Sequence, residues 1–200
     1  MRKIILNLAG ILVLASALAQ NTLNPDERKR AIAHLKETEN NLVSLTRGLS
    51  EQQLNFKEDD TAWSIAECVE HIAISEKNLI GMIQMSLKED SDPSKRSEVQ
   101  MTDDQILGLI ESREQKVKTR TEFEPTNSFG SYAETMKTFR ERRKANLQFV
   151  KSTREDLRNH YLQFPFGLID SYQGILFMSG HTRRHTDQIK EIMSSEGFPN

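Results

Sequence analysis

The chain has 200 residues, of which 36% are hydrophobic and 28% charged, and its formal net charge at pH 7 is −2. This composition fits one soluble domain that is large enough to bury a core, and it excludes an intrinsically disordered chain. The mildly acidic balance also argues against a nucleic-acid-binding protein, because such proteins carry clusters of Lys and Arg that contact phosphates.

The beginning of the chain has the pattern of an export signal. Arg2 and Lys3 precede an apolar run over residues 4–14, and Ala17-Leu18-Ala19 has small residues at the two positions that a signal peptidase reads. The apolar run is short for a membrane span, which needs about 20 residues, although an uncleaved anchor is the alternative.

We therefore expect the chain to have two parts. Residues 1–19 are a predicted signal peptide that is cleaved before Gln20, and residues 20–200 are a predicted helical-bundle domain that is periplasmic or secreted. Cleavage reduces Lys and Arg from 27 to 25 against 29 Asp and Glu, so the formal charge becomes −4. We expect no stable membrane anchor in the mature protein.

Helical patterns cover most of the remaining sequence, and no long stretch has the alternation of a strand. Asn24-Pro25 is typical of a helix start, whereas Pro93 and Pro125 mark breaks. Three of the predicted helices span residues 25–46, 64–87 and 131–152. Another begins at residue 102 and ends before residue 124, and the last is capped by Asp170 or Ser171. The predicted loops are 49–61, 88–100, 124–130 and 164–167. This order predicts an all-α fold, an up-and-down four-helix bundle with one additional helix.

Two histidines lie on the apolar face of the last predicted helix. At 3.6 residues per turn, His181 and His185 share a face with Phe177 and Ile189, whereas Thr182 and the charged residues beside it take the other face. Two inward imidazoles need partners, and a pair at i and i+4 can bind one metal ion. Core histidines that are hydrogen-bonded to hydroxyl or carbonyl groups are the alternative, and this spacing alone does not decide between them.

A third histidine, His71, lies in the segment from residue 62 to residue 72. This segment resembles the second-helix motif of the DinB-like family, which consists of small helical-bundle proteins. The resemblance continues through Asp156-Leu157-Arg158-Asn159-His160, Asp170-Ser171-Tyr172-Gln173 and the segment 181–189, in the same order. It covers nearly the whole mature chain, from Asp26 to Pro199.

In that family one histidine of the second helix and an HxxxH pair of the last helix hold a divalent metal. The resemblance therefore implies that His71, His181 and His185 are metal ligands. Judged from the residues alone, His71 lies on the flank of its helix's apolar stripe, where a solvated surface histidine is the alternative.

Three imidazoles on Zn²⁺ or Ni²⁺ leave at least one coordination position open, which suits chemistry better than a structural site closed by four protein ligands. Such a metal acidifies a bound water toward a pKa of about 7 and ionises a bound thiol. The resemblance implies a metal-dependent enzyme of the thiol-dependent transferase or hydrolase type, acting on a small molecule that the sequence does not identify. The alternative is a non-catalytic exported bundle that binds a metal or a ligand. The oligomeric state is open, with a homodimer among the states considered.

Three further residues are candidates for supporting roles. Glu67 lies one turn before His71 and is predicted to support a ligand histidine or to act as the catalytic proton acceptor, although a solvated helix carboxylate is the alternative. Gln188 follows His185 by one turn and is expected to orient an imidazole or a bound water. Cys68 is the single cysteine, so it excludes an intrachain disulfide, and we expect a small buried hydrophobe here rather than a fourth ligand.

The export pattern makes a prediction that does not depend on the fold. We expect native protein to begin at Gln20, because the small residues at 17 and 19 direct signal peptidase to that bond. N-terminal sequencing of protein isolated from its natural compartment measures this directly. Intact Met1 on cytoplasmic protein would contradict the export prediction.

Overall fold

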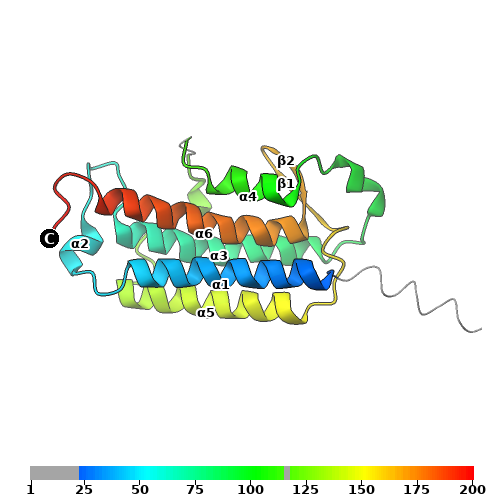
Figure 1. The fold of residues 1–200 in the computed structure, drawn as a ribbon, viewed down its shortest axis with the longest axis horizontal. Helices are drawn as coiled ribbons and strands as arrows, with labels where there is room; N and C mark the ends of the chain where they lie inside the picture. Colours follow the sequence, from blue (N-terminus) through cyan, green and yellow to red (C-terminus); the bar gives the residue numbers. More distant parts are fainter. Residues whose placement is uncertain (1–22, 115–117) are drawn as a thin grey trace, which may run out of the picture.

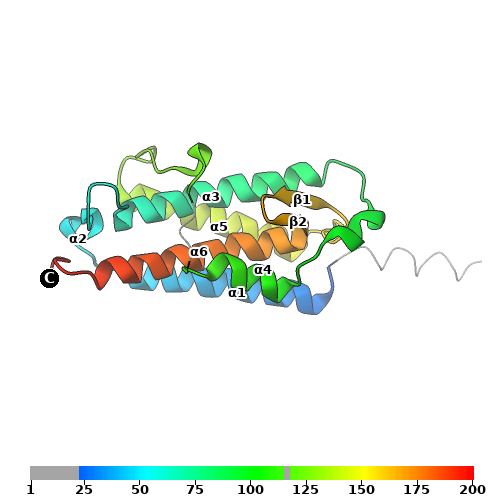
Figure 2. The same cartoon turned by 90° about the horizontal axis from the view of Figure 1, so that it is seen from above.

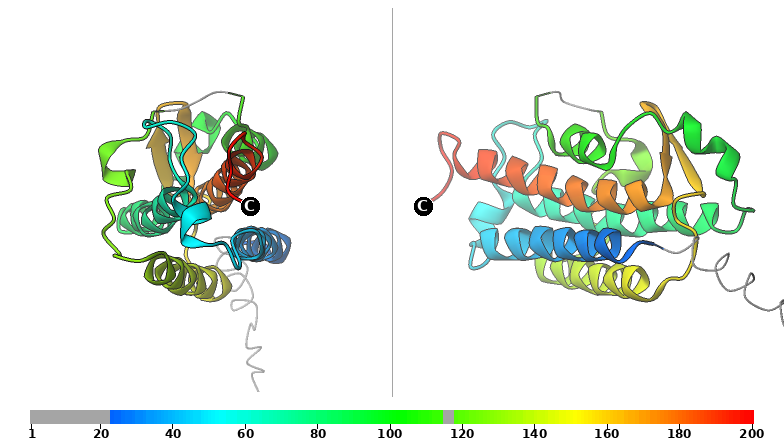
Figure 3. Two further views of the ribbon diagram at one scale, coloured as in Figure 1. Left: turned by 90° about the vertical axis from the view of Figure 1, so that its left-hand side faces the viewer. Right: turned by 45° about the vertical axis from the view of Figure 1, so that its right-hand side comes forward.

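The computed structural model describes residues 23–114 and 118–200, and four long helices dominate it (Figure 1). An end-on view shows them at the four corners of a bundle (Figure 3, left). Their bounds are α1 Pro25–Leu45, α3 Ile65–Ser86, α5 Tyr132–Ser152 and α6 Ser171–Met193. These bounds agree with the four long helices that the sequence predicts to within two residues. The signal-peptide prediction falls on residues outside the described part of the chain.

Local capping explains why the helices begin where they do. The side chain of Asn24 accepts a backbone hydrogen bond at the start of α1, and the side chain of Glu27 accepts one from the backbone of Asn24 in return. Ser64 with Glu67 begins α3 in the same way, and Asp170 is the N-cap of α6. Each such cap stabilises a helix by about 1 kcal/mol, and it depends only on residues three positions apart.

The direction of the helices differs from the predicted up-and-down order. The C-terminal ends of α3 and α5 lie together, where the Asp92 amide donates to the Asn159 carbonyl at 2.9 Å. α1 begins at that same end, since Arg28 Nη2 donates to the Thr153 carbonyl at 3.0 Å. Helices α3 and α5 are therefore parallel, as are α1 and α6, so the simple up-and-down prediction is wrong. The reason is that the long connection between α3 and α5 runs back along the bundle before α5 starts.

That connection contains two 3₁₀ turns and the short helix α4, which packs on α6 outside the bundle (Figure 2). Its elements are the 3₁₀ turns η1 Pro93–Glu98 and η2 Thr121–Phe123 and the helix α4 Asp103–Glu111. The predicted third helix is thus real but ends at Glu111, well before residue 124. The sequence also missed the short helix α2, Glu51–Asn55, within the predicted loop 49–61.

A β-hairpin precedes α6 where the sequence predicts a loop. Its strands are β1 Tyr161–Phe164 and β2 Gly167–Asp170, paired antiparallel with Leu162 opposite Ile169. Gly167 follows the turn with a φ of 129°, a conformation that L-residues with a side chain rarely adopt. Four residues per strand are too few for an alternating pattern to stand out in the sequence. The hairpin contacts α3 and α6, and so covers one end of their interface.

A cluster of charges ties the elements together at the hairpin end of the bundle. The guanidinium of Arg158 bonds to Glu27 at the start of α1, to Asp103 at the start of α4 and to Asp170 at the start of α6, at 2.7 to 3.1 Å. Its planar face also lies 4.2 Å from the ring centre of Tyr172. The helix dipoles favour carboxylates at the N-terminal ends of these three helices. One cation therefore binds three such carboxylates and connects the helices.

Two apolar clusters fill the bundle, and a polar layer lies between them. The cluster nearer the hairpin contains Leu35, Leu79 and Met178, and the cluster nearer α2 contains Leu42 and Phe139. The polar layer consists of Thr38, Glu76, Arg143, Asn146, Ser179 and Thr182, all of which are buried.

Arg143 of α5 occupies the centre of the polar layer. Its guanidinium donates to Glu76 of α3 at 2.5 and 3.1 Å, to Leu35 O and Thr38 Oγ1 of α1 at 2.5 and 2.8 Å, and to Thr182 Oγ1 of α6 at 2.7 Å. One side chain therefore bonds to the three other long helices. The sequence assigns Thr182 to the outer face of α6, and this is wrong because α6 is covered by α1, α3 and α4 together.

No helix within residues 23–114 and 118–200 has the length and apolar character needed to cross a membrane.

The buried ion pair predicts an uneven response to substitution. Removing the carboxylate in Glu76→Ala leaves the Arg143 cation buried without its counterion, so we expect a loss of about 3–5 kcal/mol in the free energy of unfolding. Glu134→Ala is the matched control, because it breaks only the exposed pair with Lys137, worth less than about 1 kcal/mol. Urea unfolding followed by circular dichroism measures both. Equal losses in the two variants would contradict this assignment.

Candidate metal centre

Three histidines from two helices converge at the interface of α3 and α6. His71 projects from α3, and His181 and His185 project from consecutive turns of α6. The Nε2 atom of His181 lies 3.1 Å from Nε2 of His71 and 3.2 Å from Nε2 of His185. One ligand atom from each histidine lies within 4.8 Å of the others. The structure thus brings together the three residues that the sequence marked as metal ligands.

Hydrogen bonds on the far side of two rings determine which nitrogen carries the proton. His71 Nδ1 lies 2.7 Å from the Phe123 carbonyl oxygen, which can only accept a hydrogen bond. His185 Nδ1 lies 2.8 Å from Gln188 Oε1, and Arg113 Nη1 donates to the same oxygen at 3.4 Å. Both Nδ1 atoms therefore donate, and the Nε2 atoms of neutral His71 and His185 carry lone pairs.

These lone pairs test whether the trio fits a metal. Both point at Nε2 of His181, which has at most one proton and can satisfy only one of them. A divalent cation at the centre would satisfy all three nitrogens. Imidazole nitrogens at about 2.0–2.1 Å from a tetrahedral Zn²⁺ are about 3.3 Å apart, close to the separations of 3.1 and 3.2 Å found here. The donor set and its spacing therefore fit a divalent metal.

Burial keeps these imidazoles neutral. His71 and His185 are 3% and 7% exposed, and His181 is partly exposed. Burial lowers the pKa of His71 to about 4, against the favourable hydrogen bond to Phe123. Burial lowers the pKa of His181 and of His185 well below the ordinary value, and neighbouring imidazoles lower them further. Neutral imidazole is the form that binds a metal.

Aromatic rings cover the faces of the histidine rings. The Trp63 ring lies 4.8 Å from the His71 ring and 6.1 Å from the His185 ring, centre to centre. On the other side, the Phe177 ring lies nearly parallel to the His181 ring at 6.4 Å and contacts Phe164 of the hairpin. The histidine trio therefore has an aromatic ring as a neighbour on either side.

The candidates for supporting roles have different positions. Gln188 contacts His185 as expected. The Glu67 carboxylate instead accepts from the Ser64 amide and from Lys57 Nζ, each at 2.8 Å, and it does not belong to the group of converging ligand atoms. Its catalytic role stays a prediction that these contacts do not favour. Cys68 is fully buried and is also outside that group.

Sequence reasoning gave no role to three residues that contact or adjoin the trio and its hydrogen-bond partners. Phe123 contributes only its backbone carbonyl, so its side chain carries no signal for this role. Arg113 lies between α4 and η2, and it donates to Glu191 at 2.6 and 3.2 Å as well as to Gln188. Glu70 directly precedes His71 and is 5% exposed. A charged residue within a largely buried helix is the one signal that the sequence offered for it.

The other described histidines have structural surroundings. His160 is buried and its two ring nitrogens contact the carbonyl oxygens of Asp156 and Glu89. His34 contacts Ser179 Oγ at 2.8 Å and Glu111 Oε1 at 3.0 Å, an arrangement that has the residue types of a hydrolytic triad. Ser179 is fully buried in the middle of α6, however, so a substrate cannot reach its hydroxyl.

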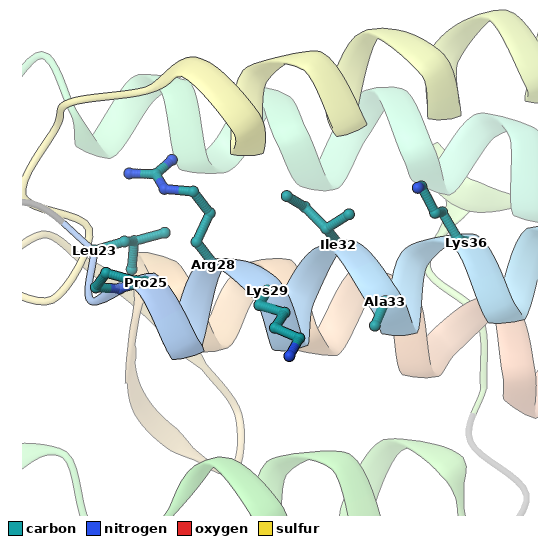
Figure 4. Close-up of a pocket in the computed structure, with 7 residues that line it drawn as sticks. All are labelled: Leu23, Pro25, Arg28, Lys29, Ile32, Ala33 and Lys36. Atoms are coloured by element: carbon teal, nitrogen blue, oxygen red, sulfur yellow. The ribbon is translucent and has the colours of Figure 1, made fainter.

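A surface hollow along α1 lies apart from the histidines (Figure 4). Its lining combines apolar and basic side chains and contains none of the metal-ligand candidates. These residues are Leu23, Pro25, Arg28, Lys29, Ile32, Ala33 and Lys36. Arg28 is engaged by carbonyl oxygens of α5 and the following loop. This hollow and the histidine trio are therefore separate features of the surface and the interior.

Comparison with known proteins shows the family of this chain. The DinB superfamily matches residues 34–189, which include all three histidines. The chain belongs to the DinB superfamily. A DinB relative in Bacillus subtilis (strain 168), the uncharacterised protein YuaE, is 29% identical over 147 residues, covering 73% of this chain and 86% of YuaE.

A solved structure shows a similar fold. It is YfiT from Bacillus subtilis, described as a probable metal-dependent hydrolase with an unusual four-helix bundle topology. The TM-score is 0.58 with 15% sequence identity, and the match covers 87% of this chain and 90% of YfiT. At this identity the likeness shows the fold alone.

The single thiol gives a test of the packing beside the site. Burial raises the pKa of Cys68 to about 12, so the thiolate that reacts with disulfide reagents is scarce at pH 8. We expect no reaction of native protein with 5,5′-dithiobis(2-nitrobenzoate) over an hour, and one thiol per chain in 6 M guanidinium chloride. Rapid reaction of the native protein would show that the α3 core opens readily.

Proposed function

We propose that this DinB protein is a metal-dependent hydrolase whose divalent metal, Zn²⁺ or Ni²⁺, is bound by His71, His181 and His185. The observation that carries the proposal is the convergence of three Nε2 atoms, two of which have lone pairs fixed by hydrogen bonds to their Nδ1 atoms. The description of YfiT as a probable metal-dependent hydrolase supports the reaction class.

A divalent metal held by three imidazoles supplies an activated water at neutral pH and polarises the bond to be cleaved. The chain's own residues prepare the place for it. The Phe123 carbonyl and Gln188 Oε1 hold two rings in one tautomer and one orientation. These two imidazoles therefore do not have to change tautomer or rotate when a metal binds. Trp63 and Phe177 cover the outer ring faces, so the polar centre is surrounded by a low-dielectric lining.

Substrate would approach from the side of His181. It is the one partly exposed member of the trio, and its ring neighbour Phe177 is partly exposed as well. Phe166 of the hairpin turn, which stacks on Phe164 at 5.1 Å, is 37% exposed. A partly exposed aromatic surface therefore leads up to the metal centre, and it suits a substrate that presents an apolar group beside the bond to be cleaved.

Metal binding is the first test of the proposal. We expect protein loaded with Zn²⁺ or Ni²⁺ to retain about one metal ion per chain through gel filtration, and His181→Ala to retain none while staying helical. His34→Ala is the matched control, since it removes a half-buried histidine that lies outside the trio and should leave the stoichiometry unchanged. Elemental analysis and circular dichroism give the two readouts. Full metal retention in His181→Ala would remove that residue from the site.

Activity is the second test, and it separates the alternatives. We expect loaded wild-type protein to hydrolyse members of a panel of 4-nitrophenyl esters and 4-nitroanilides, with loss on chelation and recovery on adding metal. A requirement for added thiol would indicate the thiol-dependent transferase class instead. A protein that binds metal stoichiometrically and turns over no substrate in either format would favour the non-catalytic metal-binding alternative.

A further inference from the structure

Glu70 makes an unusual set of contacts immediately beside a proposed metal ligand. Its carboxylate accepts from the amides of Thr126, Asn127 and Ser128 at 3.3, 2.9 and 2.7 Å, and from Ser128 Oγ at 3.0 Å. Three consecutive backbone N–H groups that face one anion form a concave anion-binding arrangement. Hydrogen bonds to an ionised carboxylate are stronger than bonds between neutral groups. Glu70 therefore fixes the backbone of residues 126–128 against α3.

The backbone of residues 126–128 forms a turn whose amides face Glu70. Asn127 has a φ of 57°, in the left-handed region, and it is the only residue other than glycine with a positive φ in the described part of the chain. Asn adopts this region more readily than most residues with a side chain, so residue 127 suits a turn of this shape. Here the turn directs three amides toward the Glu70 carboxylate.

The same segment supplies the carbonyl that holds His71. Phe123 lies three residues before Thr126, and its oxygen accepts from His71 Nδ1 at 2.7 Å. Asn78 Nδ2 also donates to the Glu122 carbonyl at 2.8 Å, which attaches the segment to α3 at a second point. His71 lies between Glu70 and Asn78 along α3. The position of the Phe123 oxygen therefore depends on the two flanking attachments.

We propose that Glu70 is a positioning residue, which holds His71 in the Nδ1–H tautomer by fixing the segment that carries the Phe123 carbonyl. It acts through the backbone of residues 123–128 and does not touch the metal position. The inference rests on the proposed function for its relevance to metal binding. It assigns to Glu70 the supporting role that the sequence suggested for Glu67.

The decisive readout is the tautomer of His71 in metal-free protein, measured by long-range ¹H–¹⁵N NMR correlation at pH 7.5. A carboxylate that contributed to stability without positioning the Phe123 carbonyl would not alter which ring nitrogen of His71 is protonated. In wild-type protein we expect the Nδ1–H form alone. In Glu70→Gln, one oxygen is replaced by an amide that opposes the backbone N–H groups, so we expect a mixture of both tautomers.

Metal affinity is the second readout, measured by competition with a chromophoric chelator for Zn²⁺. We expect Glu70→Gln to weaken binding by about 10- to 100-fold, the range found when support of a ligand histidine is lost. Glu134→Gln is the control, because it makes the same change of charge at an exposed carboxylate of α5 that pairs with Lys137. It should change neither the tautomer nor the affinity. An unchanged tautomer and affinity in Glu70→Gln would overturn the proposal, whatever happens to thermal stability.

A second variant keeps the test informative if Glu70→Gln does not fold. Glu70→Asp retains the charge on a side chain that is one methylene shorter and cannot keep all the contacts with residues 126–128. We expect it to show a minor Nε2–H tautomer and to bind Zn²⁺ more weakly than wild type. An affinity for Glu70→Asp equal to that of wild type, with an unaltered tautomer, would count against the positioning role. If wild-type protein bound no metal, the proposed function would fail, but the tautomer measurement on metal-free protein would still decide the role of Glu70.

Discussion

The buried guanidinium of Arg143 is the interaction on which the arrangement of the bundle depends. Apolar clusters on either side of it tolerate helices that slide or rotate, because the hydrophobic effect has no direction. A guanidinium with five donors in a fixed plane does have direction. By bonding to Glu76, Thr182 and the backbone of α1, it admits one register among the four helices. A cation without these partners would be very costly at this depth.

The register set at Arg143 also places the histidines opposite each other. Thr182 follows His181 directly on α6, and Glu76 lies five residues beyond His71 on α3. The bonds from Arg143 to Thr182 and Glu76 therefore fix the two helices close to the level at which the imidazoles meet. A slip of one helical turn, about 5.4 Å, would separate Nε2 atoms that now lie 3.1 Å apart. Stability and site geometry thus share one polar layer.

The long connection between α3 and α5 has a similar double role. It reverses direction along α6, which makes α3 and α5 parallel, and it also brings Arg113 and the Phe123 carbonyl to the two sides of the histidine trio. Helix α4 packs so closely on α6 that a side chain at Gly180 would overlap Ile110. The segment that distinguishes this topology from a plain bundle therefore supplies the groups that orient the ligands.

The sequence by itself determined what depends on neighbouring residues. Caps such as Asn24 and Asp170 act within three positions, and the i, i+4 spacing of His181 and His185 places them on one face of any helix. Only the tertiary structure decided the direction of α5, the burial of Thr182 and the contacts of Glu70. Those outcomes depend on contacts between residues more than 30 positions apart, or on backbone carbonyls and amides, which every residue carries and no sequence pattern reveals.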